Sequence, residues 1–171
     1  IQCSKKAVSL IFENLYEAYV DGNNVTARTN MQRASYLAGV AFTRAYVGYV
    51  HAIAHTLGGF YNYPHGLANA VILPYVLEYY GKSVYKPLAE LADLIGITDS
   101  TDDIEQKAKK FIEAIKKLNE DMDIPQKVSG ILEKDVPLMV ERALKEANPF
   151  YPVPKILFKQ DMMNLYKMIK E

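Results

Sequence analysis

Residues 46–59 read YVGYVHAIAHTLGG, an apolar segment that holds two of the three histidines and ends in paired glycines. Glycine is common just past the end of a helix, so this segment predicts a helix over residues 46–57 that stops at Gly58. Pro64 follows a short connection and stands where a new helix can begin. We expect that helix to cover residues 65–80 and to end at Gly81.

The chain upstream of Pro64 contains no proline, which permits long helices with few breaks. Apolar residues recur at three- and four-residue steps through the first helix, which we expect to end at the turn sequence Asp-Gly-Asn-Asn, residues 21–24. A second helix is expected from Ala27 to beyond Phe42. Its apolar residues lie on all sides, so we expect a buried central helix with Phe42 packed in the core.

The second half of the chain predicts more polar and more regular helices. They are expected over residues 84–95, over 102–118 with an N-terminal cap at 99–101 and a buried apolar stripe at 104–118, over 126–132, over 136–147 and over 159–170. The proline-rich stretch 148–154 cannot be helical. No segment alternates apolar and polar residues convincingly, so the fold class is all-α, with about seven to nine helices. The length of 171 residues fits a single domain over residues 1–171.

Charge and composition exclude several classes of protein. Lys and Arg number 20, as do Asp and Glu, and the resulting zero net charge argues against nucleic-acid binding. No run reaches the roughly 20 apolar residues that a membrane-spanning helix needs. Cys3 is the single cysteine, which rules out an internal disulfide or a cysteine-based zinc site and fits a reducing compartment, the cytoplasm. Because the chain begins with Ile1 instead of methionine, we expect a piece of a longer protein.

The three histidines are the residues most informative about chemistry. They are His51, His55 and His65, all within one 15-residue window. His51 and His55 are one helical turn apart and project from one face, and His65 follows a glycine turn that can fold the chain back toward it. Imidazole suits iron, zinc, copper or nickel, and the spacing first suggests His51 with His55 as ligands. Histidines in apolar helices also occur as core residues hydrogen-bonded to carbonyls, and spacing alone leaves both interpretations open.

A longer pattern surrounds these histidines. Residues 48–59, GYVHAIAHTLGG, are followed by PHGLANA at 64–70 and by Leu73-Pro74. Together these stretches resemble the signature of iron-containing (group III) alcohol dehydrogenases, and the resemblance continues into residues 30–41 and 143–149. It implies the C-terminal, helical, metal-binding half of the iron-containing alcohol dehydrogenase and dehydroquinate synthase-like fold.

The resemblance also assigns roles to the histidines. It implies that His51 and His65 bind Fe(II) or Zn, whereas His55 lies beside the nicotinamide and the substrate and takes part in catalysis. The family's other two metal ligands, an Asp and a His four residues apart, belong upstream of Ile1, as does its nucleotide-binding domain. No Gly-x-Gly-x-x-Gly occurs in this chain. Asn69 is expected either as a polar cap of the helix that bears His65 or as part of the catalytic site.

The intact protein would then interconvert an alcohol and an aldehyde or ketone by hydride transfer with NAD or NADP, as a cytoplasmic homodimer, and this chain alone would be inactive. Two alternatives remain at this point. One is a glycerol dehydrogenase or dehydroquinate synthase-like relative, although the PHGLANA sequence at residues 64–70 favours the alcohol dehydrogenase branch. The other is a non-catalytic helical interaction module whose histidines are core residues. Loss of bound metal on substitution of His51 or His65 would favour the enzyme.

Overall fold

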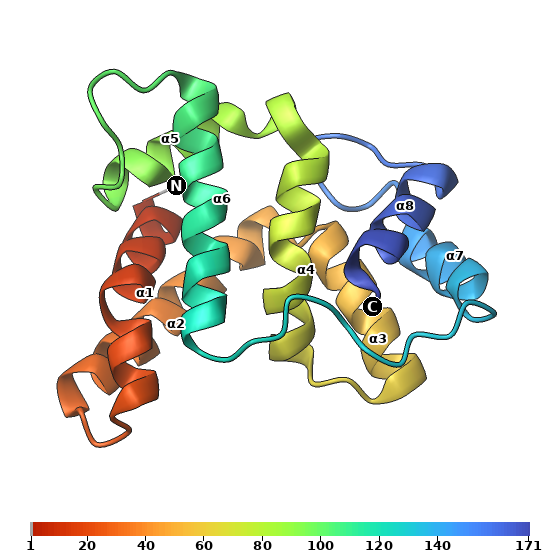
Figure 1. The fold of residues 1–171 in the computed structure, drawn as a ribbon, viewed down its shortest axis with the longest axis horizontal. Helices are drawn as coiled ribbons and strands as arrows, with labels where there is room; N and C mark the ends of the chain where they lie inside the picture. Colours follow the sequence, from red (N-terminus) through yellow and green to blue (C-terminus); the bar gives the residue numbers. More distant parts are fainter. Residues whose placement is uncertain (1) are drawn as a thin grey trace. The chain divides into compact units, whose positions relative to one another are not determined.

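A computed structural model describes residues 2–171 (Figure 1). The elements are α1 (Gln2–Val20), α2 (Val25–Ala45), α3 (Tyr49–Tyr61), α4 (His65–Tyr80), the 3-10 helix η1 (Gly81–Ser83), α5 (Tyr85–Leu94), α6 (Ile104–Asp121), α7 (Val136–Ala147) and α8 (Lys159–Ile169). Over these residues the only β-type pairing is an isolated bridge between Val128 and Lys170. The predicted all-α fold is confirmed. Within the same residues, no helix combines the length and the apolar character needed to cross a membrane.

The helices fall into two compact units. The first combines the chain up to Tyr46 with residues 85–114, and the second combines residues 47–84 with 115–171. Each is therefore assembled from two stretches of sequence. The expectation of a single domain over residues 1–171 stays a prediction.

In the first unit, α1 and α2 form a helical hairpin. The Asn24 side chain caps α2 by accepting a hydrogen bond from the Ala27 N–H at 3.0 Å. Between the helices, the Asn30 amide donates to the Asn14 side-chain oxygen at 2.9 Å. The turn predicted at residues 21–24 lies where expected, between Val20 and Val25.

The expectation that α2 is buried on all sides is wrong. Ala27 and Ala34 are its buried residues, whereas Tyr36 is 72% and Phe42 is 53% exposed. An apolar side chain favours burial, but whether it is buried depends on which other parts of the protein pack against it. The two small residues lie buried in the hairpin, and the larger apolar side chains elsewhere on α2 stay exposed. Phe42 is accordingly no core residue in this structure.

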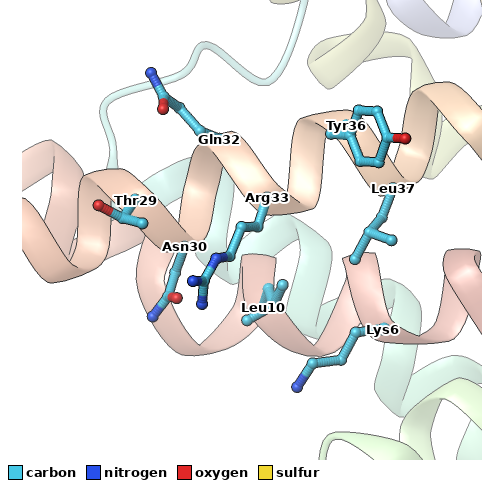
Figure 2. A pocket seen from close by; sticks show the side chains of 8 residues that line it. All are labelled: Lys6, Leu10, Thr29, Asn30, Gln32, Arg33, Tyr36 and Leu37. Atoms are coloured by element: carbon cyan, nitrogen blue, oxygen red, sulfur yellow. The ribbon is translucent and has the colours of Figure 1, made fainter.

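A pocket opens on the α1–α2 hairpin (Figure 2). Its lining residues are Lys6, Leu10, Thr29, Asn30, Gln32, Arg33, Tyr36 and Leu37. The lining contains two cationic side chains and no histidine, cysteine or carboxylate, so the pocket lacks the side chains that usually bind iron or zinc.

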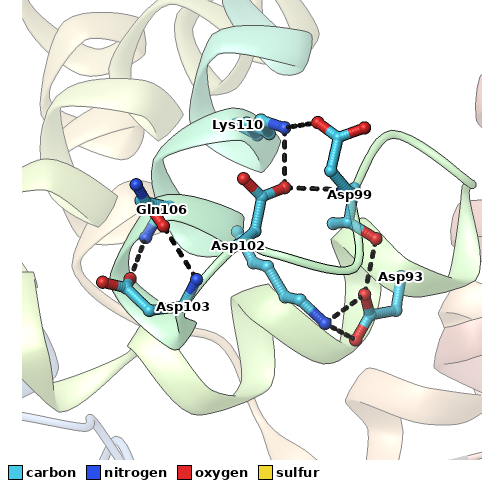
Figure 3. Close-up of polar contacts among 8 residues, drawn as sticks. Asp93, Asp99, Asp102, Asp103, Gln106 and Lys110 are labelled. Carbon is cyan, nitrogen blue, oxygen red and sulfur yellow. Dashed lines mark hydrogen bonds and ion pairs between the residues drawn. The ribbon is translucent and has the colours of Figure 1, made fainter.

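The start of α6 shows how polar side chains fix a helix end (Figure 3). Asp103 accepts a hydrogen bond from the Gln106 N–H at 2.8 Å, and Gln106 accepts one from the Asp103 N–H at 2.8 Å. This reciprocal pair is a capping box. The cap predicted at residues 99–101 is therefore misplaced. Asp99 and Asp102 instead both accept hydrogen bonds from Lys110, each at 2.6 Å.

In the second unit, α3 packs against α4 and α7, while α8 packs against α4 and α7. Tyr49, Ile53 and Leu57 point into this core and are fully buried. The predicted start and end of this helix are both shifted. It begins at Tyr49 because Tyr46 has φ 60°, and it runs through the paired glycines to Tyr61, where Asn62 adopts a left-handed conformation.

The helix predicted over residues 126–132 is absent, and this stretch is irregular. Its Val128 N–H donates to the Ile169 carbonyl at 2.7 Å, and its carbonyl accepts from the Glu171 N–H at 3.2 Å. Val128 and Ile131 are buried. Gly130, at φ +81°, adopts a conformation incompatible with a right-handed helix. Pairing with the end of the chain and burial of two side chains replace the local helix.

Candidate metal and catalytic site

The three histidine side chains meet at one place in the second unit. His51 and His55 are one turn apart on α3, and His65 is the first residue of α4. The ring centroids are 6.0 Å apart for His51 and His55, 5.4 Å for His51 and His65, and 5.3 Å for His55 and His65. The connection between α3 and α4 folds the chain back, as the sequence suggested. The three separations are so similar that proximity alone does not select a pair of ligands.

His51 is half-buried. Burial lowers the pKa of its imidazole below the ordinary value of 6.5, and the neighbouring His65 and His55 rings lower it further, while Glu146 acts in the opposite direction. The neutral form is the one that binds a metal ion, because protonation removes the lone pair. The surroundings of His51 therefore favour the form that a metal ligand requires.

His55 is exposed, and its Nδ1 lies 2.7 Å from Oε1 of Glu146 on α7. The same carboxylate oxygen accepts a hydrogen bond from the Tyr151 hydroxyl at 2.8 Å. No local pattern in the sequence indicates this contact. Glu146 is 91 positions from His55, and in the sequence it is an ordinary acidic residue near the end of a helix.

His65 is exposed and is in contact with Asn69, one turn along α4. The Asn69 side-chain nitrogen lies 3.1 Å from Nε2 of His65 and donates to the His65 carbonyl at 2.8 Å. Asn69 Oδ1 is buried and has no hydrogen-bond partner. The residue therefore does not cap the N–H groups of the first turn. It holds the His65 ring and carbonyl.

The donor set fits part of a metal site. Imidazole nitrogens are ligands that both Fe(II) and Zn accept readily. Over residues 2–171, however, no group of three or more His, Cys, Asp or Glu side chains is placed to hold a metal ion. The carboxylate nearest to the cluster, Glu146, is bonded to His55 and Tyr151. A metal bound at these histidines would need additional ligands.

A helical unit with three clustered histidines defines a candidate metal-binding domain, and comparison with known proteins places it in a family. The family model described as "Fe-containing alcohol dehydrogenase family, C-terminal" matches residues 2–169. The chain belongs to this family and corresponds to its C-terminal part.

Individual relatives agree with the family model. A 1,3-propanediol dehydrogenase of Klebsiella pneumoniae is 46% identical over 147 residues, covering 85% of this chain and 38% of that protein. Alcohol dehydrogenase 4 of Saccharomyces cerevisiae is 43% identical over 149 residues, covering 85% of this chain and 37% of that protein. The chain therefore spans about two fifths of the length of these relatives.

Solved structures show the same fold. A crystal structure of 1,3-propanediol oxidoreductase is 40% identical and superposes with a TM-score of 0.91, covering 97% of this chain and 44% of that one. An alcohol dehydrogenase from Oenococcus oeni is 39% identical, with a TM-score of 0.89, and the match covers 96% of this chain and 43% of that one. The predicted resemblance to the C-terminal helical part of the family is confirmed.

Proposed function

We propose that this chain is the metal-binding part of an enzyme that interconverts alcohols and aldehydes or ketones by hydride transfer with NAD or NADP. The observation that carries the proposal is the meeting of His51, His55 and His65 in a chain of this family. The names of the relatives, a 1,3-propanediol dehydrogenase and an alcohol dehydrogenase, support a small alcohol as substrate. A cytoplasmic homodimer is the form we propose for the intact protein.

His51 and His65 are the proposed metal ligands, for Fe(II) or Zn. When bound, such an ion lowers the pKa of an alcohol oxygen and so favours the alkoxide from which hydride leaves. His51 contributes a half-buried imidazole whose neutral form is favoured. His65 contributes an exposed ring, and metal binding at its Nε2 would displace the Asn69 side-chain nitrogen that lies 3.1 Å from that atom.

His55 is the proposed catalytic residue and the proposed contact to the nicotinamide. Its ring stacks on that of His65, with centroids 5.3 Å apart and an angle of 18° between the planes. Because Nδ1 is bonded to Glu146, Nε2 is the ring atom left to accept or return a proton. The His51 and His65 rings lie beside the His55 ring, so proton transfer at His55 would take place next to the proposed metal ligands.

Metal titration of the chain tests the ligand assignment. Isothermal titration calorimetry with Zn²⁺ should show weak binding to the 171-residue chain, because two imidazoles supply only part of a coordination shell. His51→Ala and His65→Ala should each weaken binding at least about tenfold, which is roughly 1.4 kcal/mol. His55→Ala is the matched control and should bind Zn²⁺ as the unaltered chain does.

Two outcomes would contradict the assignment. If His55→Ala weakens Zn²⁺ binding as much as His51→Ala does while His65→Ala leaves binding unchanged, the pair on α3 is the ligand pair and His65 is not. If all three variants bind Zn²⁺ unchanged but unfold more readily, the histidines have a structural role, as in the interaction-module alternative.

A further inference from the structure

The carboxylate of Glu146 on α7 joins two helices of the second unit at the histidine cluster. Its Oε1 lies 2.7 Å from Nδ1 of His55 on α3, within a helix pair that packs together. We propose that Glu146 is a positioning residue for His55, which fixes the proton of the neutral imidazole on Nδ1 and keeps Nε2 free. This inference rests on the proposed function for its catalytic meaning, but the contact itself does not depend on that function.

The chemistry of the two groups determines where the proton lies. An ionised carboxylate accepts hydrogen bonds and cannot donate one, whereas a neutral imidazole has one N–H and one lone pair. A contact of 2.7 Å between Nδ1 and Oε1 therefore requires the proton on Nδ1. The lone pair is then on Nε2. A hydrogen-bond acceptor that holds one ring nitrogen in this way determines both the tautomer and the orientation of the imidazole ring.

Glu146 is itself held in place. It lies in the last turn of α7, and the Tyr151 hydroxyl donates to its Oε1 at 2.8 Å. Burial raises the pKa of Tyr151, and the hydrogen bond to Glu146 adds to that shift, so the phenol stays a neutral donor. The Glu146 side chain is about two thirds covered, with 31% exposed. Its single well-placed oxygen thus serves a hydroxyl and an imidazole together.

The arrangement provides a function that a simple ion pair would not. A histidine that exchanged freely between tautomers would present Nε2 with a proton part of the time and without one the rest. With Glu146 in place, the neutral ring presents a lone pair at Nε2 and can accept a proton there. Once that proton arrives, the carboxylate stabilises the resulting imidazolium.

Histidine NMR on the 171-residue chain tests the proposal directly. In a chain labelled with ¹⁵N in its three histidines and held at a pH where the imidazoles are neutral, His55 should show the Nδ1–H tautomer. Glu146→Ala should shift His55 toward the Nε2–H tautomer that free histidine favours. Glu146→Gln, whose amide oxygen can still accept from Nδ1–H, should retain the original tautomer. Tyr151→Phe is the control that removes the other bond to Glu146, and His55 should keep its Nδ1–H form.

The readout separates positioning from stability. A purely structural Glu146 would change the melting temperature in Glu146→Ala and leave the tautomer of a folded chain unaltered. That result would overturn the proposal. So would a dominant Nε2–H form of His55 in the unaltered chain, a measurement that requires no variant to fold. Because no metal or nucleotide is added, failure here leaves the Zn²⁺ titration of His51 and His65 as an independent test of the proposed function.

Discussion

His51 shows how the position of one side chain sets its preferred charge. Burial and two neighbouring imidazoles lower the pKa of His51 below 6.5, the ordinary value that it regains on unfolding. Between the lowered pKa and 6.5, the unfolded chain binds a proton that the folded chain does not. Acid therefore stabilises the unfolded state in this window. The contribution of neutral His51 to stability is fully present above pH 6.5 and is lost as the pH falls through the lowered pKa.

This reasoning gives a prediction for His51→Gln. The free energy of unfolding, measured with urea, should fall less steeply from about pH 8 to about pH 5 in the variant than in the unaltered chain. The reason is that glutamine does not take up a proton on unfolding, as His51 does in this pH range. The comparison of slopes cancels the titration of groups common to both proteins. Equal losses of stability over this pH range in both chains would mean that folding does not lower the pKa of His51.

At the site, residue types and spacing could be predicted, but partners could not. The histidine window, and the return of the chain after the paired glycines, are local features of residues 51–65 that the sequence displays. The contact between His55 and Glu146 joins positions 91 apart. Such a contact depends on how α3 packs on α7, and no local pattern encodes that packing. For this reason the positioning of His55 emerged only from the structure.

The helices themselves show the same division. The approximate bounds predicted for His65–Tyr80 and Val136–Ala147 agree with the structure, because a proline stands at the start of each helix and a glycine or an Asn-Pro pair follows it. The stretch 126–132 was predicted as a helix and is irregular, because its backbone pairs with the end of the chain. The prediction that α2 is buried on all sides was wrong for a related reason. Local sequence determines a helix, while tertiary partners determine what it contacts and what stays exposed.

A buried hydrogen bond links α3 to α8 and offers a prediction for this pair of helices. Thr56 donates to the Ile53 carbonyl at 2.7 Å, which uses its only proton, so the Tyr166 hydroxyl must be the donor in the 2.5 Å contact between Thr56 and Tyr166. Both side chains are buried. Thr56→Val should cost about 1–3 kcal/mol, because it leaves the Tyr166 hydroxyl buried without an acceptor.

The double variant Thr56→Val with Tyr166→Phe provides the control. Removal of both polar groups with little change in shape should recover most of the stability lost in Thr56→Val. Urea unfolding of Thr56→Val, Tyr166→Phe and the double variant measures this coupling. If the loss of stability in the double variant equals the sum of the losses in the two single variants, the hydrogen bond between the two hydroxyls contributes no specific energy.

At the scale of the whole molecule, the described residues form a helical fold but bring together only part of the groups that the proposed chemistry needs. It spans 38% of the Klebsiella pneumoniae relative, although the match covers 85% of this chain. Its histidines cluster, yet among the described residues no group of three or more His, Cys, Asp or Glu side chains is placed to hold a metal ion. Two of its larger apolar side chains on α2, Tyr36 and Phe42, are exposed to solvent. The proposed reaction would therefore need more groups than the described residues bring together at the histidine cluster.

We therefore predict that the purified 171-residue chain does not turn over. Hydride transfer would require the nicotinamide and the alcohol to be aligned in one site, and such alignment supplies a large part of an enzyme's rate enhancement. With His51 and His65 as the only proposed ligands, we expect a metal ion to be held too weakly to orient the alcohol. The measurement is NADH oxidation at 340 nm with a small aldehyde and added Fe²⁺ or Zn²⁺, with the 1,3-propanediol dehydrogenase of Klebsiella pneumoniae assayed in parallel. Aldehyde reduction by the chain that disappears in His51→Ala would contradict this prediction, because it would show that the groups within these 171 residues suffice for catalysis.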